Sequence, residues 1–343
     1  MTDFQFFIEN VLQLLITGVS LGAIYGLMCV GLAMIFGIMR VINFAQGDFM
    51  MIGMYAAFFA LTLLGLPSFL GPVVGPYVAV LLAAPLLYVF GWLIHRTLIR
   101  RVTGIETADL EGEGHYAQLI LTLGIALILQ NGAMILFGAE LISIRTPLSS
   151  DAIFVGPFLD GLAVFLNKAR LVSACISVVI IVALWWVIKS TTLGKSLRAA
   201  ADNPEAAIYM GIDVDRSHRT AFALGTAITA TAGGLLATNY PFHPFVGLEY
   251  VIIMYAGVVL GGIGSVIGAF WGGMAIGLVQ QLSTIILPTQ LQNATIFVFF
   301  LLIVILRGKF QLGTFYGAML ETGRTSAMIL FIVVGATAFT GVF

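Results

Sequence analysis

Charged residues are scarce in this 343-residue chain: they make up 9% of it, whereas a typical soluble domain has about 25%. The chain has 15 Lys and Arg against 16 Asp and Glu, a formal net charge of −1. No stretch concentrates basic residues over a phosphate-sized track, which argues against a nucleic-acid partner. Hydrophobic residues reach 60% and the mean hydropathy is +1.08. This composition predicts an all-α, polytopic protein in contact with the lipid bilayer.

The chain also has little of the chemistry that enzymes and metal sites need. Its two cysteines, Cys29 and Cys175, lie in apolar runs, which favours buried small side chains over a disulfide. Its four histidines occur without HxxH or HExxH spacing and there is no CxxC, so no metal site is expected. The Gly-Lys-Ser triplet at 194–196 imitates a phosphate-binding loop, but an apolar run rather than a strand precedes it. We therefore expect no enzyme activity and no cofactor bound by this chain.

Long apolar runs predict about eight or nine transmembrane helices, because a helix needs roughly 20 apolar residues to cross the hydrocarbon core. The first run has no basic residue before it and is expected to be retained as a span. Eight segments are convincing and a ninth closes the chain: Val11–Ile38, Phe49–Leu66, Val73–Ile94, Ala117–Phe137, Leu171–Ile188, Ala221–Thr238, a double segment Tyr250–Leu287, Ala294–Leu306, and finally Ser326–Phe343.

The distribution of Lys and Arg predicts the orientation. Three basic stretches, at residues 96–101, 189–219 and 307–309, fall in the cytoplasm together only if the N-terminus lies outside and Tyr250–Leu287 enters and leaves on one side. That segment would then be a hairpin or a re-entrant pair that turns at Gly261–Ser265, and its short first run favours a re-entrant arm. The loop 139–170 then lies outside, against the rule, and is expected to carry a short element at Phe154–Leu166.

A polar island, residues 198–219, lies between two apolar runs. Asn203 can cap a helix, Pro204 suits the first helical position, and Gly211 can end it. These residues predict a two-turn helix, Pro204–Met210, which is too short to be stable alone and needs a partner. An ordinary solvated loop is the alternative. The residues expected to couple to a partner are Arg198, Asn203, Pro204, Glu205, Ala206, Ala207 and Gly211.

The island resembles the cytoplasmic coupling loop of ABC-importer permeases, which lies in a groove of the ATPase subunit. Two further stretches, Ile42–Phe49 and Gly261–Ser265, are similar to hallmark stretches of branched-chain amino-acid permeases of the Liv type. The similarity covers about residues 10–306. It implies that residues 1–306 are the permease domain of an ATP-driven importer in a bacterial or archaeal cytoplasmic (inner) membrane, carrying branched-chain amino acids or related small polar solutes.

The same resemblance implies the partners: a second homologous permease, two cytoplasmic ATPases that use ATP and Mg, and an extracytoplasmic solute-binding protein. Permeases for urea or amides remain an alternative. So does an ion-driven secondary transporter, although we expect no acidic or basic residue centrally in a span, where a proton relay would need one.

Several polar and glycine residues are candidates for the substrate pathway. Those that follow the first span can lie at a membrane boundary or a cavity mouth, although Asp48 could equally cap a helix. Buried amides in the fourth span could instead bond helix to helix, and the glycine-rich turn could serve tight packing. The candidates are Asn43, Gln46, Asp48, Gln130, Asn131, Gly261, Gly262, Gly264 and Ser265.

Residues 307–343 depart from the family pattern, because a polar linker and an extra apolar helix follow the last expected span. Residues 316–343 resemble a piece of the large membrane subunit of TRAP-type transporters. A fusion, a shifted reading frame and an accessory anchoring helix are all open, and we expect no transport role for this segment.

Overall fold

The computed structural model describes residues 3–101, 113–158, 162–288 and 291–306, together with separate positions between 313 and 334. The chain divides into two units, residues 1–296 and 297–343, and the fold described below is that of the first, together with the one helix, Gln292–Leu306, in which the boundary falls. Most of the expected last helix, Ser326–Phe343, lies outside the described residues, as do the basic residues Arg307 and Lys309. The permease and tail domains assigned from the sequence stay predictions.

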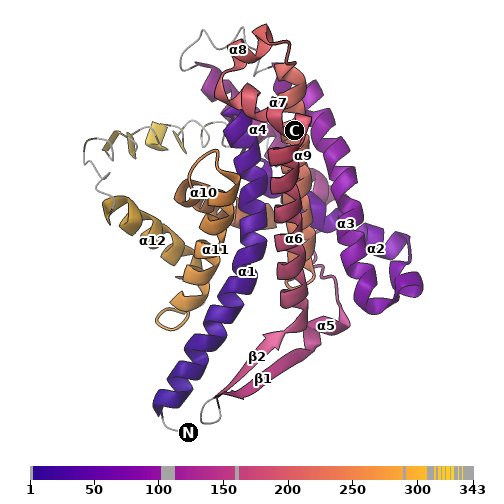
Figure 1. Ribbon diagram of the computed structural model, residues 1–343, viewed down its shortest axis with the longest axis vertical. Coiled ribbons are helices and arrows are strands. Elements are labelled where there is room, and N and C mark those ends of the chain that lie inside the picture. Colours follow the sequence, from indigo (N-terminus) through magenta and orange to yellow (C-terminus); the bar gives the residue numbers. More distant parts are fainter. Residues whose placement is uncertain are drawn as a thin grey trace. The chain divides into compact units, whose positions relative to one another are not determined.

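Helices make up nearly all of the first unit (Figure 1). Among the described residues, seven helices are long and apolar enough to cross a membrane, and two shorter apolar helices accompany them. The predicted all-α polytopic class is therefore confirmed. The helices are α1 (Asp3–Met39), α2 (Gln46–Leu63), α3 (Leu66–Thr97), η1 (Ile99–Arg101), α4 (Glu113–Phe137), α5 (Pro147–Ser150), α6 (Lys168–Ser190), α7 (Thr192–Asp202), α8 (Pro204–Tyr209), α9 (Val214–Ala237), α10 (Val246–Gly261), α11 (Val266–Ser283) and α12 (Gln292–Leu306).

The short element expected at Phe154–Leu166 is an antiparallel hairpin of β1 (Ala152–Phe158) and β2 (Leu162–Asn167). Both strands are rich in β-branched and aromatic residues, which favour extended backbone. The rings of Phe154 and Phe165 pair across it at 5.3 Å, and Gln13 of α1 donates to the Phe165 carbonyl. The hairpin thus lies beside the N-terminal part of α1, while α7 and α8 lie at the other end of that helix (Figure 1).

Glycines allow α1 and α11 to pack backbone to backbone. Gly18, Gly22 and Gly26 recur at four-residue intervals and so share one face of α1. A Cβ atom on Gly273 of α11 would lie 2.6 Å from the Gly26 Cα atom, and one on Gly277 would lie 2.6 Å from the Gly22 nitrogen. Only glycine allows this approach, which is the small-residue packing typical of membrane helices.

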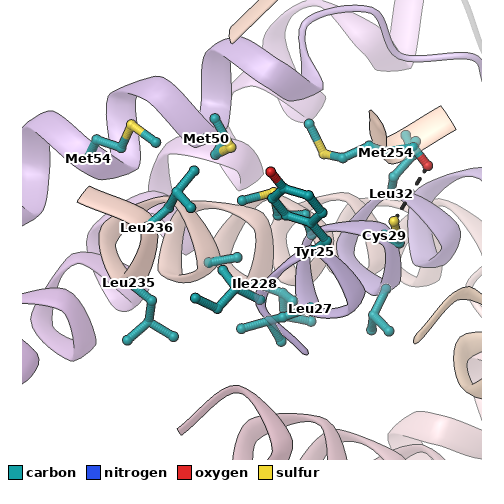
Figure 2. Close-up of a cluster of buried hydrophobic side chains, with 14 of the residues drawn as sticks. Tyr25, Leu27, Cys29, Leu32, Met50, Met54, Ile228, Leu235, Leu236 and Met254 are labelled. Atoms are coloured by element: carbon teal, nitrogen blue, oxygen red, sulfur yellow. Dashed lines mark hydrogen bonds between the residues drawn. The ribbon is translucent and has the colours of Figure 1, made fainter. Parts of the chain in front are cut away.

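The core of the bundle joins α1, α2, α9 and α10 (Figure 2). Cys29 is fully buried there and its thiol donates to the Met254 carbonyl at 3.6 Å, as expected for a small buried side chain. Cys175 is exposed, which corrects the expectation of burial, because it lies between the buried positions Ala174 and Ser177 on a different side of α6. Labelled core residues include Tyr25, Leu27, Leu32, Met50, Met54, Ile228, Leu235 and Leu236.

Two helices begin inside the bundle rather than at its end. Gln46, the first residue of α2, donates to the Gly225 carbonyl of α9, and a Cβ atom on Gly31 of α1 would lie 2.7 Å from that same oxygen. Gly31 precedes the end of α1 by eight residues, or about 12 Å along the axis. The chain therefore turns back after α1 before α2 starts.

The helix α10 is the second interrupted element. Its start lies against the start of α2, since a Cβ atom on Gly247 would lie 2.7 Å from the Gly47 carbonyl carbon. Its end leads into the predicted glycine-rich turn, where Gly264 lies beside Gly37 near the end of α1. The double segment is thus a hairpin with a short first arm, as the sequence indicated, although it begins at Val246 rather than Tyr250.

Candidate functional site

The polar island folds into the helix that the sequence predicts. The Asn203 side chain caps α8 by accepting a hydrogen bond from the Ala206 nitrogen at 3.0 Å. Pro204 holds the first helical position, where its missing N–H costs nothing. After the last turn Gly211 adopts a φ of +78°, a conformation that favours glycine and ends the helix. The expected start and stop residues therefore occupy the expected positions.

The two faces of α8 differ in their surroundings. Ala207 is 3% exposed and packs in a small cluster with Ala200 of α7 and Val214 of α9. Tyr209 and Met210, at the tip, are 88% and 82% exposed. The helix is therefore anchored to its own chain on one side and presents large apolar side chains to the surroundings on the other. Glu205 and Ala206 are also exposed.

The sequence analysis missed α7, the helix that supports α8. Thr191 caps it through a hydrogen bond from the Gly194 nitrogen at 3.2 Å. Gly194, Leu197 and Ala200 recur at three-residue intervals and are buried, a pattern that indicates one packed helical face. Arg198, on the other side, donates to the Ile188 carbonyl at the end of α6. The threonine cap and this spacing were the available signals.

A pocket of about 1010 Å³ joins the island to the glycine-rich turn. Arg198 of α7 lines it together with Gly264 and Ser265 of the turn. The end of α1 supplies a third wall, where Arg40 donates to the Ala201 carbonyl. Two stretches that are far apart in the sequence therefore face one space.

Each member of the glycine-rich turn has its own geometry. Gly262 and Gly264 have φ values of +99° and +85°, so these positions require glycine to reverse the chain. Gly261 instead packs against α11, because a Cβ atom there would lie 2.7 Å from the Ala269 nitrogen. Ser265 caps α11 by accepting a hydrogen bond from the Gly268 nitrogen. Turning and packing thus occur together in this stretch.

A buried polar network follows α1. Asn43 donates to the Gln46 side-chain oxygen at 2.9 Å, and Gln46 donates to the Thr229 hydroxyl at 2.5 Å. Both amide side chains are fully buried. The sequence analysis placed them at a boundary or a cavity mouth, but they line neither of the two described pockets. The turn after α1 carries them inside, where buried amides need such partners.

Asp48 lies where α2 and α10 begin. It is 2% exposed and accepts a hydrogen bond from the Gln130 side chain of α4 at 2.9 Å. It does not cap α2, whose N-cap residue is Ala45 and has no side-chain cap bond. Asp48 is the third residue of α2, so it lies at the start of that helix rather than centrally in it, and α2 begins three residues before Phe49, where the apolar run was expected to start.

Gln130 and Asn131 are neighbours in α4 but differ in environment. Gln130 is buried and bonds to Asp48. Asn131 is exposed and donates to the Leu127 carbonyl of its own helix. Since adjacent residues on a helix point about 100° apart, only one of them can face α2. The structure thus brings Gln130 to the other candidates and leaves Asn131 outside.

The chain is similar to known membrane transport permeases over most of its length. The family described as "Branched-chain amino acid transport system / permease component" matches residues 14–306. The permease LivH of Escherichia coli K12 is 28% identical over 298 residues, which cover 86% of this chain and 92% of the relative. BraD of Pseudomonas aeruginosa is 29% identical over 310 residues, covering 89% and 97%. No solved structure matches the chain.

Other relatives widen the range of organisms and solutes. A probable LivH of Methanocaldococcus jannaschii is 30% identical over 267 residues, 75% of this chain and 76% of the relative. An autoinducer 2 import permease, LsrC of Klebsiella pneumoniae, is 32% identical over 113 residues, only 31% of this chain and 32% of the relative. The match over residues 14–306 shows that this chain belongs to the family of branched-chain amino acid transport system permease components.

Proposed function

We propose that the chain is the permease subunit of an ATP-driven importer of branched-chain amino acids in a cytoplasmic (inner) membrane. It would assemble with a second homologous permease, two ABC ATPases and an extracytoplasmic binding protein. ATP and Mg would be used by the ATPases, and the chain itself would have no catalytic role. Family membership and the names of the relatives that cover most of the chain support this proposal over an ion-driven transporter or a urea permease.

The observation that carries the coupling role is the exposed apolar tip of α8. Ile208, Tyr209 and Met210 are all exposed, although fully burying one large apolar side chain contributes roughly 1.5–3 kcal/mol. A partner that covers this tip gains that free energy. Because Asn203 and Ala207 hold the other side of α8 to the chain, a force on the tip is passed to α7 and α9.

The arrangement of basic residues supports the proposed orientation. Lys189, Lys195, Arg198, Arg216 and Arg219 all lie in or beside the segments at the α7 and α8 end of the first unit. The positive-inside rule assigns that end to the cytoplasm. The N-terminus, at the other end of α1, would then lie outside.

Impermeant thiol labelling tests the orientation. In a variant with Cys175→Ser, we expect Lys195→Cys to react only after the membrane is opened and Arg145→Cys to react in intact cells, since both side chains are exposed. The reverse pattern would mean that the N-terminus faces the cytoplasm.

The pathway assignment combines the buried polar network and the glycine-rich turn. Gly264 and Ser265 line the pocket beside α7, so a movement of the island would change the shape of that pocket. Asn43, Gln46, Asp48 and Gln130 supply polar groups deeper in the bundle, which are rare at membrane depth and mark pathways or helix contacts.

Replacement of the α8 tip tests the coupling role. We expect the double variant Tyr209→Ala, Met210→Ala to lose ATP-dependent uptake and to co-purify with less ATPase, while the amount of permease in the membrane is unchanged. Leu141→Ala is the matched control, because Leu141 is also an exposed apolar residue but lies in the loop after α4. Glu205→Lys and Gly211→Arg should abolish uptake in the same way.

Two outcomes would contradict the proposal. Normal uptake and normal ATPase recovery in the tip variant would remove the coupling role. Uptake that survives ATP depletion would instead favour an ion-driven transporter.

A further inference from the structure

A second groove, separate from the pocket beside the glycine-rich turn, lies between α3, α7 and α9. Its volume is about 770 Å³. Aromatic residues of α3, hydroxyl residues of α7 and arginines of α9 line it: Tyr88, Trp92, Thr192, Ser196, Arg216 and Arg219. This combination of rings, hydroxyls and cations has no part in the coupling or pathway assignments above.

Positive charge gathers around one indole ring in this groove. The guanidinium groups of Arg96 and Arg219 lie 5.1 Å and 5.5 Å from the Trp92 ring centroid, within the range of cation–π attraction. Arg216 forms no ion pair with any described residue. Within the part of the chain that the structure describes, the Arg216 guanidinium is therefore not paired with a carboxylate, although Asp213 also lines the groove.

Two carboxylates of the described residues lie near these cations. Asp215 lies 3.5 Å from Arg100 and 3.9 Å from Arg219, on a partly exposed surface. Asp213 caps α9 by accepting a hydrogen bond from the Arg216 backbone nitrogen. The first turns of α7 and α9 also line the groove, and helix N-termini carry partial positive charge. An anion with several oxygen acceptors fits this environment.

One exposed face of α3, next to the face that lines the groove, is apolar. Leu82, Leu86, Val89 and Leu93 are all exposed, and their spacing of four, three and four residues places them on one face. Trp92 lies five residues before the end of α3, where tryptophan marks the level of lipid headgroups. An anion bound here would therefore lie on the same helix as an apolar surface that suits acyl chains, on the neighbouring side of α3.

We propose that this groove binds an anionic phospholipid of the leaflet at the α7 end, with the phosphate at Arg216 and Arg219 and the acyl chains along α3. Basic pockets between membrane helices bind such headgroups, whereas a soluble protein partner has no use for the apolar stripe. Gly211 and Ile212, which join α8 to α9, also line the groove. The bound lipid would thus brace the base of α8, a consequence that rests on the proposed function.

Native mass spectrometry of the purified transporter tests the binding itself. The complex is mixed with equal amounts of phosphatidylglycerol and phosphatidylcholine, and the lipid that stays bound is counted. We expect preferential retention of phosphatidylglycerol, and a loss of roughly fivefold in Arg216→Gln, the ratio that corresponds to about 1 kcal/mol for one basic residue near an anionic surface. Arg216→Lys, which keeps the charge, should retain most of the binding.

Lys195→Gln is the matched control, because it removes one exposed positive charge from α7 outside the groove. It should leave lipid retention unchanged. Equal retention of both lipids by the unaltered protein, or equal loss in the control, would overturn the proposal. So would complete displacement of phosphatidylglycerol by inorganic phosphate, which would indicate a site for free anions. Loss of ATPase subunits from Arg216→Gln with unchanged lipid retention would assign the groove to the ATPase.

Discussion

The first turns of α2 and α10 pack so closely that position 47 has no room for a side chain. In Gly47→Ala the new Cβ atom would lie 2.7 Å from the Gly247 carbonyl carbon, whereas carbon atoms pack best at about 3.5–4.0 Å. One helix start must therefore move by roughly 1 Å. Asp48 and its bond to Gln130 lie at the same place, so the shift also disturbs a buried carboxylate. We expect the free energy of unfolding to fall by about 2–3 kcal/mol, at the upper end for overpacking.

Thermal unfolding in a single detergent measures this loss, and uptake into proteoliposomes shows whether transport falls with it. Gly132→Ala in α4 is the matched control, since among the described residues only its own stretch of helix lies within 4 Å of the new methyl group and alanine favours helix over glycine by about 1 kcal/mol. It should be as stable as the unaltered protein or more so. If Gly47→Ala unfolds at the same temperature as this control, the close approach of the two helix starts is wrong.

Three further replacements probe the island and the buried polar groups. Gln130→Leu removes the side-chain donor to the buried Asp48 carboxylate and should destabilise the protein by about 1–3 kcal/mol in the same unfolding assay. Asn131→Leu, at an exposed neighbour, should cost less than about 0.5 kcal/mol. Asn203→Ala removes the cap of α8, which is worth about 1 kcal/mol, so amide hydrogen exchange in residues 206–210 should become roughly fivefold faster. Asn203→Asp keeps a capping oxygen and should restore the slow exchange rate. If it does not, the capping role is wrong. Gly262 has a φ of +99°, and a Cβ atom there would meet open space. In Gly262→Ala, backbone strain alone should therefore lower the free energy of unfolding by about 1–2 kcal/mol. Unchanged stability would contradict that turn geometry.

The sequence predicts the island well because its signals are local. A capping amide, a proline and a terminal glycine act on their own few residues. The structure places Asn203, Pro204 and Gly211 in those roles. The glycine-rich turn was predicted for the same reason, since positive φ at Gly262 and Gly264 is a property of the backbone at those positions.

The sequence could not predict how deep the polar residues lie. Asp48 precedes an apolar run, which is equally compatible with a membrane boundary, but the turn after α1 carries it inside to Gln130. That depth depends on contacts with α9 that are remote in sequence, such as the bond from Gln46 to Thr229. The orientation of Asn131 also depends on tertiary contacts. The residues of α4 itself are apolar on every face, so no amphipathic pattern marks the face that packs inward.

The packing of α1 against α11 could be predicted only in part from the sequence. Four-residue glycine spacing marks a face for close packing on each helix, but several helices carry glycines. The turn supplies the missing information, because Gly264 lies beside Gly37 and α11 must then run back along α1. Gly26 lies eleven residues before Gly37, and Gly273 lies nine residues after Gly264. These offsets are nearly equal, so once the turn is placed, the antiparallel register brings Gly26 and Gly22 opposite Gly273 and Gly277, as observed.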